Sequence, residues 1–278
     1  MFSLRLLDTT VDLRVDTQDA ADGVGLLLAP FVTDEVADID DRNCFALVDG
    51  DHTGIEERAG MLLAYRNGKV LGGGGDTWAN AFGAMMATLN RQVIKEYSGF
   101  ALHAGVVSIG GRAIAFPADS GGGKSTLTAA CLQAGFDYVS DESLCIDVDT
   151  GSVEAYPKPL GLSSWSRQQL GINDGTLAFP ADRNEGMVTP VGLGSSIATD
   201  PIELSHVVLS TFGADRTALV EAPGHVAMAT LIEYSFNHYK HGERAFTLAA
   251  QLANQVHVWR LDYDDPAVAA QLVKERLG

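Results

Sequence analysis

A glycine-rich segment near the middle of the chain has the residue types and spacing of a phosphate-binding loop. It reads "FPADSGGGKSTLTAACL" from Phe116 to Leu132. Its three successive glycines leave room for backbone N–H groups to converge on one anion, and the helix expected behind them adds its N-terminal dipole. Lys124 can then reach the β- and γ-phosphates of a nucleotide, and the hydroxyl of Ser125 can ligate Mg²⁺. The segment therefore predicts a nucleotide-binding site.

The loop departs from the general motif at its first position. The motif begins with a glycine six residues before the lysine, where this chain has Ala118. That glycine helps the chain to turn and presents few of the phosphate donors itself. Alanine is the smallest replacement, and it is tolerable if its φ angle stays negative. We therefore expect the loop to bind phosphate in spite of Ala118.

Two adjacent carboxylates follow the next predicted strand. The segment "FDYVSDE" predicts a strand that ends at Asp141 and Glu142. A carboxylate at such a position can hold Mg²⁺ or accept the proton of an attacking hydroxyl. Because adjacent side chains of a strand point to opposite faces, the two carboxylates should have different roles. The alternative is an exposed acidic turn, since acidic residues are abundant in this chain.

The segments around the loop alternate between strand and helix patterns. The apolar runs "LHAGVVSI" and "RAIAFPA" are joined by Gly110-Gly111, which predicts a hairpin. The run "STLTAACLQAG" behind the loop predicts a helix that ends at Gly135. Strand, glycine loop, helix and strand is the order expected of an α/β nucleotide-binding core. His103 lies in the first of these strands, where a lone histidine is most often structural.

The first hundred residues have a different texture. Apolar and polar residues alternate in "FSLRLL" and "VDLRV", as they do in half-buried strands. Asn67-Gly68 between apolar flanks predicts a hairpin turn, and the glycines Gly72–Gly75 predict a flexible turn. An apolar stripe from Trp78 to Tyr97 predicts one long helix. Farther along, the Gly-, Ser-, Asn- and Pro-rich stretch 163–199 predicts loops that could face a substrate.

Composition limits the possible partners. The chain has 278 residues, a formal charge of -17 and a hydrophobic content of 46%. Such a charge argues against nucleic acids and anionic membranes as partners, but not against a nucleotide, which is bound locally. No apolar stretch has the length of a signal-peptide core or a membrane span, and the three cysteines lack metal or redox spacing. We therefore expect a cytoplasmic protein.

Taken together, these segments resemble one known family. "LHAGVVSIGGRAIAFPADSGGGKST" and "GFDYVSDE" are similar to the catalytic domain of HPr kinase/phosphorylase, and more closely to HPr-kinase-related serine kinases that accompany bacterial peptide-modification gene clusters. The resemblance runs from His103 to about Pro159 and continues weakly through "EYSFNHYKHGERAF" and "VHVWRLDYDD". It implies an α/β fold with a phosphate-loop (P-loop) catalytic core, a mixed sheet with flanking helices. This core is expected over residues 99–278, after a small β-rich unit with a linking helix over residues 1–98.

The resemblance also implies roles for individual residues. The residues expected to bind ATP are Asp119, Ser120, Gly121, Gly122, Gly123, Lys124, Ser125 and Thr126. Asp141 is implied to be the base toward the substrate hydroxyl, and Glu142 to lie on the Mg²⁺ side with Ser125, although the two carboxylates could exchange. His103 matches a family histidine near the acidic pair, which implies a catalytic role beside Asp141 and Lys124.

The family's arginine-bearing segment has no clear counterpart in this chain. Three cations are candidates for the group that neutralises the charge developing on the phosphate, namely Lys158, Arg167 and Arg244. The alternative for each of them is a solvated surface cation. The sequence does not choose among the three.

The implied function is an ATP-dependent kinase that transfers the γ-phosphoryl group to a serine hydroxyl of a peptide or protein, such as a ribosomally made peptide precursor. Two alternatives stay open: a kinase of a small hydroxylated metabolite, and a non-catalytic nucleotide-binding regulator. The intact Lys124, Ser125 and Asp141 count against the regulator. HPr kinases assemble through their catalytic domains, so the resemblance also implies a homo-oligomer.

Overall fold

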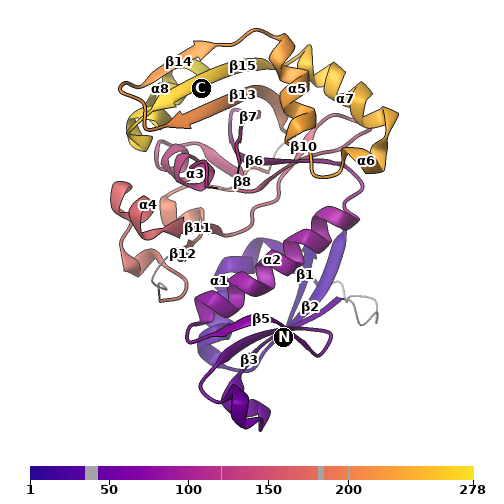
Figure 1. The fold of residues 1–278 in the computed structure, drawn as a ribbon, viewed down its shortest axis with the longest axis vertical. Helices are drawn as coiled ribbons and strands as arrows, with labels where there is room; N and C mark the ends of the chain where they lie inside the picture. Colours follow the sequence, from indigo (N-terminus) through magenta and orange to yellow (C-terminus); the bar gives the residue numbers. More distant parts are fainter. Residues whose placement is uncertain (35–42, 120, 181–184, 200) are drawn as a thin grey trace. The chain divides into compact units, whose positions relative to one another are not determined.

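The structure, a computed structural model of the chain, describes residues 1–34, 43–119, 121–180, 185–199 and 201–278. It divides into two compact units (Figure 1). Unit 1 comprises Met1–Tyr97 and Asn173–Thr189, and unit 2 comprises Ser98–Ile172 and Pro190–Gly278. The first boundary falls one residue before the expected junction. The second unit is not the unbroken stretch that was expected, because one of its internal segments belongs to unit 1.

Unit 1 is built on a five-stranded sheet. In sheet order its strands are β1 (Phe2–Leu6), β2 (Thr9–Val15), β3 (Cys44–Asp49), β4 (Leu62–Arg66) and β5 (Lys69–Gly75). The other regular elements of this unit are α1 (Gln18–Leu28), α2 (Trp78–Glu96), β12 (Glu185–Val188) and the 3₁₀ helices η1 (Ala29–Phe31), η3 (Gly50–Thr53), η4 (Glu56–Arg58) and η5 (Asp174–Thr176). Asn67 and Gly68 have φ angles of 53° and 72°, so the predicted hairpin turn between β4 and β5 is confirmed.

Two predictions about glycine-rich stretches are wrong in part. Gly72–Gly75 lies in β5 rather than in a turn, and the pairing of β5 with β4 shifts register along this stretch. Glycine tolerates such an irregular strand because it has no side chain to displace. The stretch 163–199 contains helix α4 (Ser164–Gln169) and strand β12, so it is not simply a loop.

Segment 173–189 joins unit 1 through its buried side chains. The ring of Phe179 is 3% exposed and lies 5.6 Å from the ring of Phe82 on α2, measured between centroids. It also covers Gly23 on α1, where a Cβ would lie 2.1 Å from the ring. Burying a phenylalanine side chain stabilises the fold by about 2 kcal/mol. The polar composition of this segment does not indicate such a contribution.

Unit 2 is built on an eight-stranded mixed sheet. The main order is β10-β9-β6-β7-β13-β15-β14, and β8 also pairs with β6. The strands are β6 (Phe100–Ile109), β7 (Arg112–Pro117), β8 (Asp137–Ser140), β9 (Ser143–Ile146), β10 (Val153–Glu154), β13 (Glu203–Phe212), β14 (Ala218–Glu221) and β15 (His257–Tyr263), with β11 (Leu160–Ser163) outside this sheet. Strands β7, β13 and β15 are parallel, whereas β6 and β14 run antiparallel to their neighbours. The expected α/β class, a mixed sheet with flanking helices, is therefore observed.

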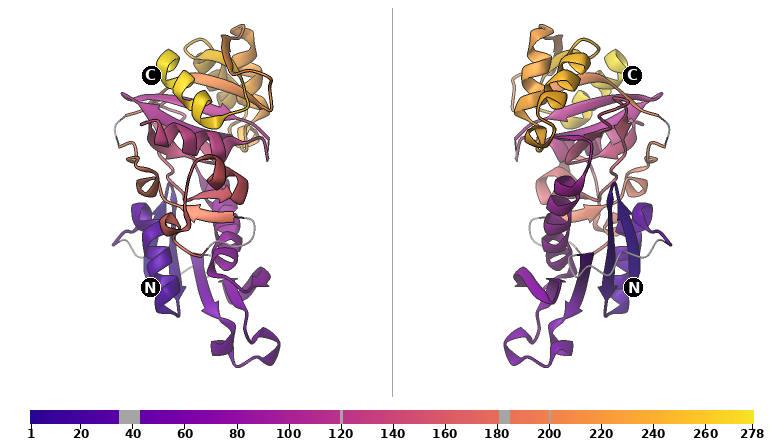
Figure 2. Two further views of the ribbon diagram at one scale, coloured as in Figure 1. Left: turned by 90° about the vertical axis from the view of Figure 1, so that its left-hand side faces the viewer. Right: turned by 90° about the vertical axis from the view of Figure 1, so that its right-hand side faces the viewer.

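Helices cover both faces of this sheet (Figures 1 and 2). The helices of unit 2 are α3 (Lys124–Gln133), α4, α5 (His225–Glu233), α6 (His238–His241), α7 (Glu243–Ala253) and α8 (Pro266–Leu277), of which α4 packs on β11 outside this sheet, and η6 (Val191–Leu193) is a 3₁₀ helix. Helices α5 and α7 bury apolar side chains in the same core cluster as the strands. Helix α3 packs against β6, β7 and α8. Its approach to β6 requires Gly105, where a Cβ would lie 2.3 Å from Thr128 Oγ1.

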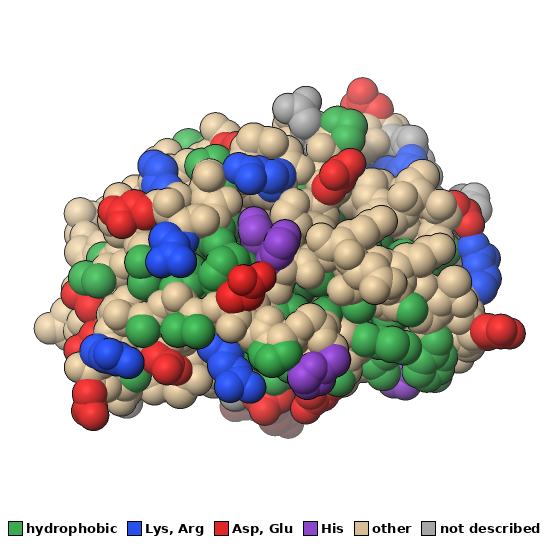
Figure 3. Space-filling model, turned by 90° about the horizontal axis from the view of Figure 1, so that it is seen from above, with side chains coloured by type: hydrophobic (Ala, Val, Ile, Leu, Met, Phe, Trp, Pro, Cys, Tyr) green, Lys and Arg blue, Asp and Glu red, His purple; other side chains and the backbone are tan. Residues whose placement is uncertain are grey.

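The surface does not single out a membrane-facing element. Among the residues that the structure describes, no helix combines the length and the apolar character that a membrane crossing requires. On the face seen in Figure 3, acidic, basic and histidine side chains are interspersed with hydrophobic ones.

One buried side chain should be important for the stability of unit 2. Asn237 is 1% exposed, accepts a hydrogen bond from the backbone N–H of Ala101 at 2.9 Å, and donates one to the carbonyl of Gly99 at 2.9 Å. Asn237→Ala should lower the free energy of unfolding by about 2 kcal/mol, because it leaves the N–H of Ala101 unpaired and removes one of the two partners of the Gly99 carbonyl, the other being His241. Urea denaturation measures this change. The control Asn254→Ala, which removes an exposed bond to Ala250, should cost less than about 0.5 kcal/mol.

Candidate active site

The glycine loop connects the end of β7 to the first turn of α3. Gly121 and Gly123 have φ angles of 82° and 81°, a left-handed conformation that other residues adopt only with strain. Gly122 has a negative φ, but a Cβ there would lie 3.0 Å from the Cβ of Ala118 and 3.1 Å from the carbonyl oxygen of Asp119. Each of the three positions therefore requires glycine for its own physical reason. The backbone N–H groups of the first turn of α3 lack partners within the helix, so they are available to an anion.

Ala118 has the negative φ angle that an alanine at this position of the loop requires. Among the described residues, positive φ angles outside glycine occur at Leu7 and Asn67 alone, so Ala118 has a negative φ. Its side chain is 8% exposed and packs inside the loop. The backbone at this position therefore does not require the glycine of the general motif. Ser120, one of the residues expected to bind ATP, lies outside the described residues.

Lys124 is folded into the loop. Its side chain is 7% exposed, and its ammonium group donates hydrogen bonds to the carbonyls of Ala118 at 2.6 Å and Asp119 at 2.8 Å. Burial lowers the pKa of Lys124, and the nearby carboxylates of Asp141, Glu142 and Asp119 oppose this effect. The loop therefore holds a partly desolvated cation, and a phosphate would compete with the two carbonyls for it.

Asp141 lies against the first turn of α3. The Ser125 hydroxyl lies close enough to its carboxylate to lower the pKa of Asp141, and the Oδ1 atom is buried without a hydrogen-bond partner among the described residues. Burial raises the pKa of Asp141 to about 6, and Glu142 adds to this, whereas Lys158, the Ser125 hydroxyl and Lys124 act in the opposite direction. Asp141 is 5% exposed, so the alternative of an exposed acidic turn is wrong for this residue.

Glu142 has a different partner. Its Oε2 atom lies 2.6 Å from Lys158 Nζ, and its side chain is 37% exposed. Partial burial alone would raise the pKa of Glu142, but the charge and hydrogen bond of Lys158, with smaller effects of His103 and Lys124, outweigh it and hold the pKa below its usual value. The two adjacent carboxylates thus differ in burial, partner and basicity, although they lie in the bend between β8 and β9 and not, as the sequence predicted, at the end of a strand.

His103 belongs to the same group of side chains. It lies on β6, pairs in register with Ser143 of β9, and its ring centroid is 5.2 Å from that of Phe236. Burial lowers the pKa of His103, with Lys124 acting in the same direction and the acidic groups Glu142 and Asp119 opposing them. The imidazole is therefore neutral at neutral pH, and it lies within electrostatic range of the loop and the acidic pair.

Of the three candidate cations, the structure places Lys158 at the carboxylates. Arg167 is 8% exposed and donates to the carbonyl of Leu162 at 2.9 Å, so it supports the start of α4. Arg244 is exposed and forms an ion pair with the exposed Asp149. Lys158 follows β10 in the sequence, and its backbone carbonyl accepts a hydrogen bond from the Tyr138 hydroxyl of β8 at 2.6 Å.

Thr126 and two tyrosines complete the surroundings of the loop. The Thr126 hydroxyl shares a hydrogen bond with the Ser166 hydroxyl at 2.7 Å, so in this structure it is engaged with α4. Tyr263 was not expected here, yet its hydroxyl lies 3.1 Å from the position that a Cβ on Gly123 would take. Tyr234 also lies within electrostatic range of Asp119. Burial raises the pKa of Tyr234, and the charge of Asp119 raises it further. In the sequence, the one indication of these two tyrosines was that the segments containing them weakly resemble the same family as the loop.

The residues present fit Mg²⁺ bound together with a nucleotide. Within the described residues, no group of three or more His, Cys, Asp or Glu side chains could hold a metal ion by itself. Mg²⁺ in proteins commonly uses one or two carboxylates plus substrate phosphates. The unpartnered Oδ1 of Asp141, next to the Ser125 hydroxyl, supplies oxygen ligands of the right kind. The site can therefore contribute to a metal ion that the phosphates complete.

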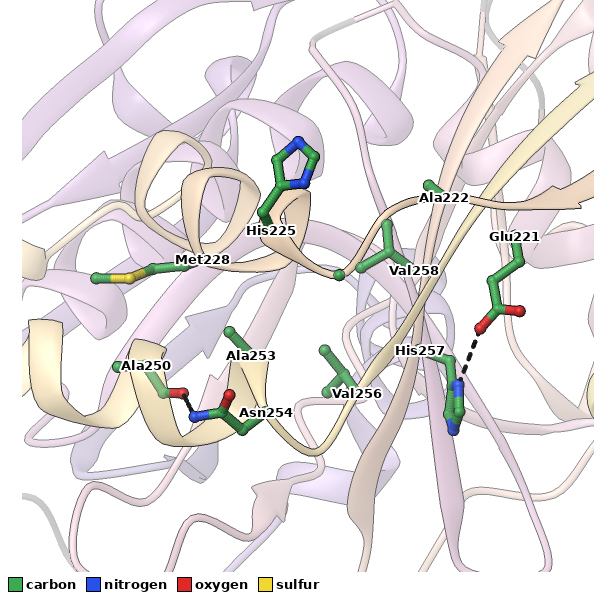
Figure 4. Close-up of a pocket in the computed structure, with 11 residues that line it drawn as sticks. Glu221, Ala222, His225, Met228, Ala250, Ala253, Asn254, Val256, His257 and Val258 are labelled. Carbon is green, nitrogen blue, oxygen red and sulfur yellow. Dashed lines mark hydrogen bonds and ion pairs between the residues drawn. The ribbon is translucent and has the colours of Figure 1, made fainter.

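A separate pocket of about 580 Å³ lies elsewhere in unit 2 (Figure 4). It is bordered by α5, α7 and the strands β14 and β15, and polar and apolar side chains line it in similar measure. His257 and Glu221 at its edge form an exposed ion pair at 3.3 Å. The loop, the acidic pair and Lys158 do not line this pocket. Its chemistry is therefore separate from that of the phosphate-binding loop.

The raised pKa of Asp141 has a consequence for stability. Its pKa rises from 3.8 to about 6 on folding, so the folded state binds its proton more tightly and loses stability as the pH rises through this window. Asp141→Asn should therefore raise the free energy of unfolding at pH 8, by up to about 3 kcal/mol, with little change at pH 4. Denaturant titrations of both proteins at the two pH values measure this. A variant that is less stable than the wild type at pH 8 would contradict it.

Comparisons with known proteins contribute no relative. No protein-family model matches the sequence, and no curated protein matches it. The resemblance to HPr-kinase-related proteins therefore rests on the quoted segments. What the structure adds is the geometry: a glycine loop, a buried lysine, and two carboxylates with different partners, all in unit 2.

Proposed function

We propose that the chain is an ATP-dependent kinase of the HPr-kinase-related type, which transfers the γ-phosphoryl group to a serine hydroxyl of a peptide or protein. The observation that carries the proposal is the buried, unpartnered Oδ1 of Asp141 beside the Ser125 hydroxyl. It brings the hydroxyl behind the loop lysine next to a carboxylate that follows the next strand. Kinases and ATPases with a phosphate loop need this pairing to hold the metal ion of the nucleotide.

Each group of the site has a role in this reaction. The loop amides and Lys124 would bind the triphosphate, and Ser125 with Asp141 would hold Mg²⁺, which neutralises phosphate charge when bound. The acceptor oxygen attacks the γ-phosphorus atom, the bond from that atom to the β-γ bridging oxygen breaks, and ADP leaves. Phosphoryl transfer asks mainly for such positioning and charge neutralisation, so this site needs no covalent intermediate.

The contacts favour the exchanged assignment of the two carboxylates. The resemblance alone suggests Asp141 as base, but Asp141 is 5% exposed and lies beside the loop hydroxyl, as a metal-side group would. Glu142 is the more exposed carboxylate, so it would accept the proton of the acceptor hydroxyl. Its lowered pKa is compatible with this role, because the loose transition state of phosphoryl transfer demands little basicity. Lys158 and the neutral His103 would position Glu142.

The proposal is tested with labelled ATP, Mg²⁺ and peptides encoded near the gene. We expect the label to appear on a serine of the peptide. The label should disappear when that serine is replaced by alanine, or when the Lys124→Ala variant is used in place of the wild-type enzyme. Label on a small hydroxylated compound instead would identify a metabolite kinase. Tight ATP binding with neither transfer nor turnover would identify a regulator. If no nucleotide binds, the proposed function is wrong.

A further inference from the structure

Three aromatic side chains form a continuous row in unit 2. Phe212 ends strand β13, Tyr263 ends strand β15, and the two residues are directly paired in register. Their ring centroids lie 5.5 Å apart, and the ring of Trp165 on α4 lies 5.2 Å from that of Phe212. Both contacts are edge-to-face, which is a favourable geometry for aromatic rings. The row therefore links a helix and two strands that are far apart in the sequence.

The row is buried at one end and exposed at the other. Tyr263 is 1% exposed, whereas Phe212 is 47% exposed and Trp165 is 42% exposed. Large apolar side chains that are exposed together, rather than singly, are a recognised sign of a binding surface. Tyr263 would anchor the row in the core, and Phe212 and Trp165 would present ring surface to a ligand.

The buried end of the row adjoins the phosphate-binding loop. The Tyr263 hydroxyl lies 3.1 Å from the position of a Cβ on Gly123. Strands β7, β13 and β15 are parallel, so the loop after β7 and the ends of the other two strands lie at the same edge of the sheet. Trp165 is tied to this edge by its neighbour Ser166, which bonds to Thr126 in the first turn of α3. Ligands of open α/β sheets bind at this edge.

We propose that Trp165 and Phe212 form the subsite for the base of the nucleotide. This inference rests on the proposed nucleotide binding, and it adds where the base lies and what kind of base is preferred. A base stacks on an aromatic ring through its π face, which every base possesses, so stacking favours the larger purine rings and does not distinguish adenine from guanine. The expected order of affinity is therefore purine nucleotides first, pyrimidine nucleotides second, and inorganic tripolyphosphate, which has no base, last.

The test compares ATP, CTP and inorganic tripolyphosphate by calorimetric titration with Mg²⁺ present. The wild type should bind ATP about tenfold more tightly than tripolyphosphate, because stacking adds to the phosphate contacts. Phe212→Ala and Trp165→Ala should each remove most of this difference and leave the affinity for tripolyphosphate unchanged. Phe246→Ala is the matched control, since Phe246 is also 47% exposed but lies on α7.

Each outcome bears on a different claim. If ATP and tripolyphosphate bind the wild type equally well, the base makes no contact and the subsite is refuted without harm to the phosphate-binding loop. If the Phe212 and Trp165 variants weaken both ligands to the same extent, the row supports the loop rather than the base, and the subsite is again refuted. If neither ligand binds the wild type, the proposed function itself fails.

Discussion

Replacing Lys124 by alanine should lower the rate of phosphoryl transfer by a hundredfold or more. The ammonium group is buried in the loop, where a charge interaction is much stronger than in water, and it lies where the β- and γ-phosphates would bind. Its loss removes several kcal/mol of transition-state stabilisation, and each ~1.4 kcal/mol is a factor of ten in rate. Initial rates with labelled ATP and a phosphorylatable peptide measure the effect.

A second lysine provides a control that distinguishes a catalytic effect of the substitution from a packing effect. Lys274 on α8 also donates to a backbone carbonyl, that of Ala134 at 2.5 Å, but it lies away from the glycine loop. Lys274→Ala should leave the rate within about twofold of the wild type, whatever it does to stability. If Lys124→Ala keeps a tenth or more of the rate, Lys124 does not neutralise a transferring phosphate, and the interpretation of the loop is wrong.

The second large effect concerns the two carboxylates, whose replacement should impair the activity in different ways. Glu142→Gln should lower kcat by about 10²- to 10⁴-fold, the usual contribution of a general base, and leave the affinity for Mg²⁺ and ATP near the wild-type value. Asp141→Asn should instead raise the Mg²⁺ concentration that half-maximal activity requires, because it removes a ligand oxygen beside Ser125. Rates and nucleotide affinities measured over a range of Mg²⁺ concentrations distinguish the two.

The reverse pattern would restore the assignment that the resemblance alone suggests. In that case Asp141→Asn would abolish turnover with normal Mg²⁺ dependence, and Glu142→Gln would weaken the metal. Glu154→Gln is a control, because Glu154 is an exposed carboxylate on the short strand β10 and should leave both properties unchanged. If both Asp141→Asn and Glu142→Gln retain full activity, the acidic pair has no part in the reaction.

Much of the local structure could be predicted because it follows from short-range rules. The turns at Asn67-Gly68 and Gly110-Gly111 have the positive φ angles that their residue types predict. The glycine loop, with α3 beginning at Lys124, lies where the motif predicts it. The apolar stripe from Trp78 to Tyr97 predicts α2, which the structure shows from Trp78 to Glu96. Each of these features depends on neighbours in the sequence.

Other features could not be predicted, because they depend on contacts between distant residues. Phe179 brings the segment 173–189 into unit 1 by packing against Phe82, and nothing near it in the sequence indicates that partner. Gly72–Gly75 has the composition of a turn, but pairing with β4 makes it part of a strand. Long-range pairing can override local propensity in this way, because strand formation depends on the neighbouring strand.

Residue types and their spacing were enough to indicate the available chemistry: three glycines, a lysine and a hydroxyl in one loop, and two carboxylates one helix and one strand later. The tertiary structure made these groups differ from one another. It buried Asp141 against Ser125, paired Glu142 with Lys158 rather than leaving both carboxylates in water, and extended the site toward Tyr263. The physical reason is that burial and charge pairing depend on what surrounds a side chain in three dimensions, and that the parallel strands β7, β13 and β15 bring their distant ends to one edge.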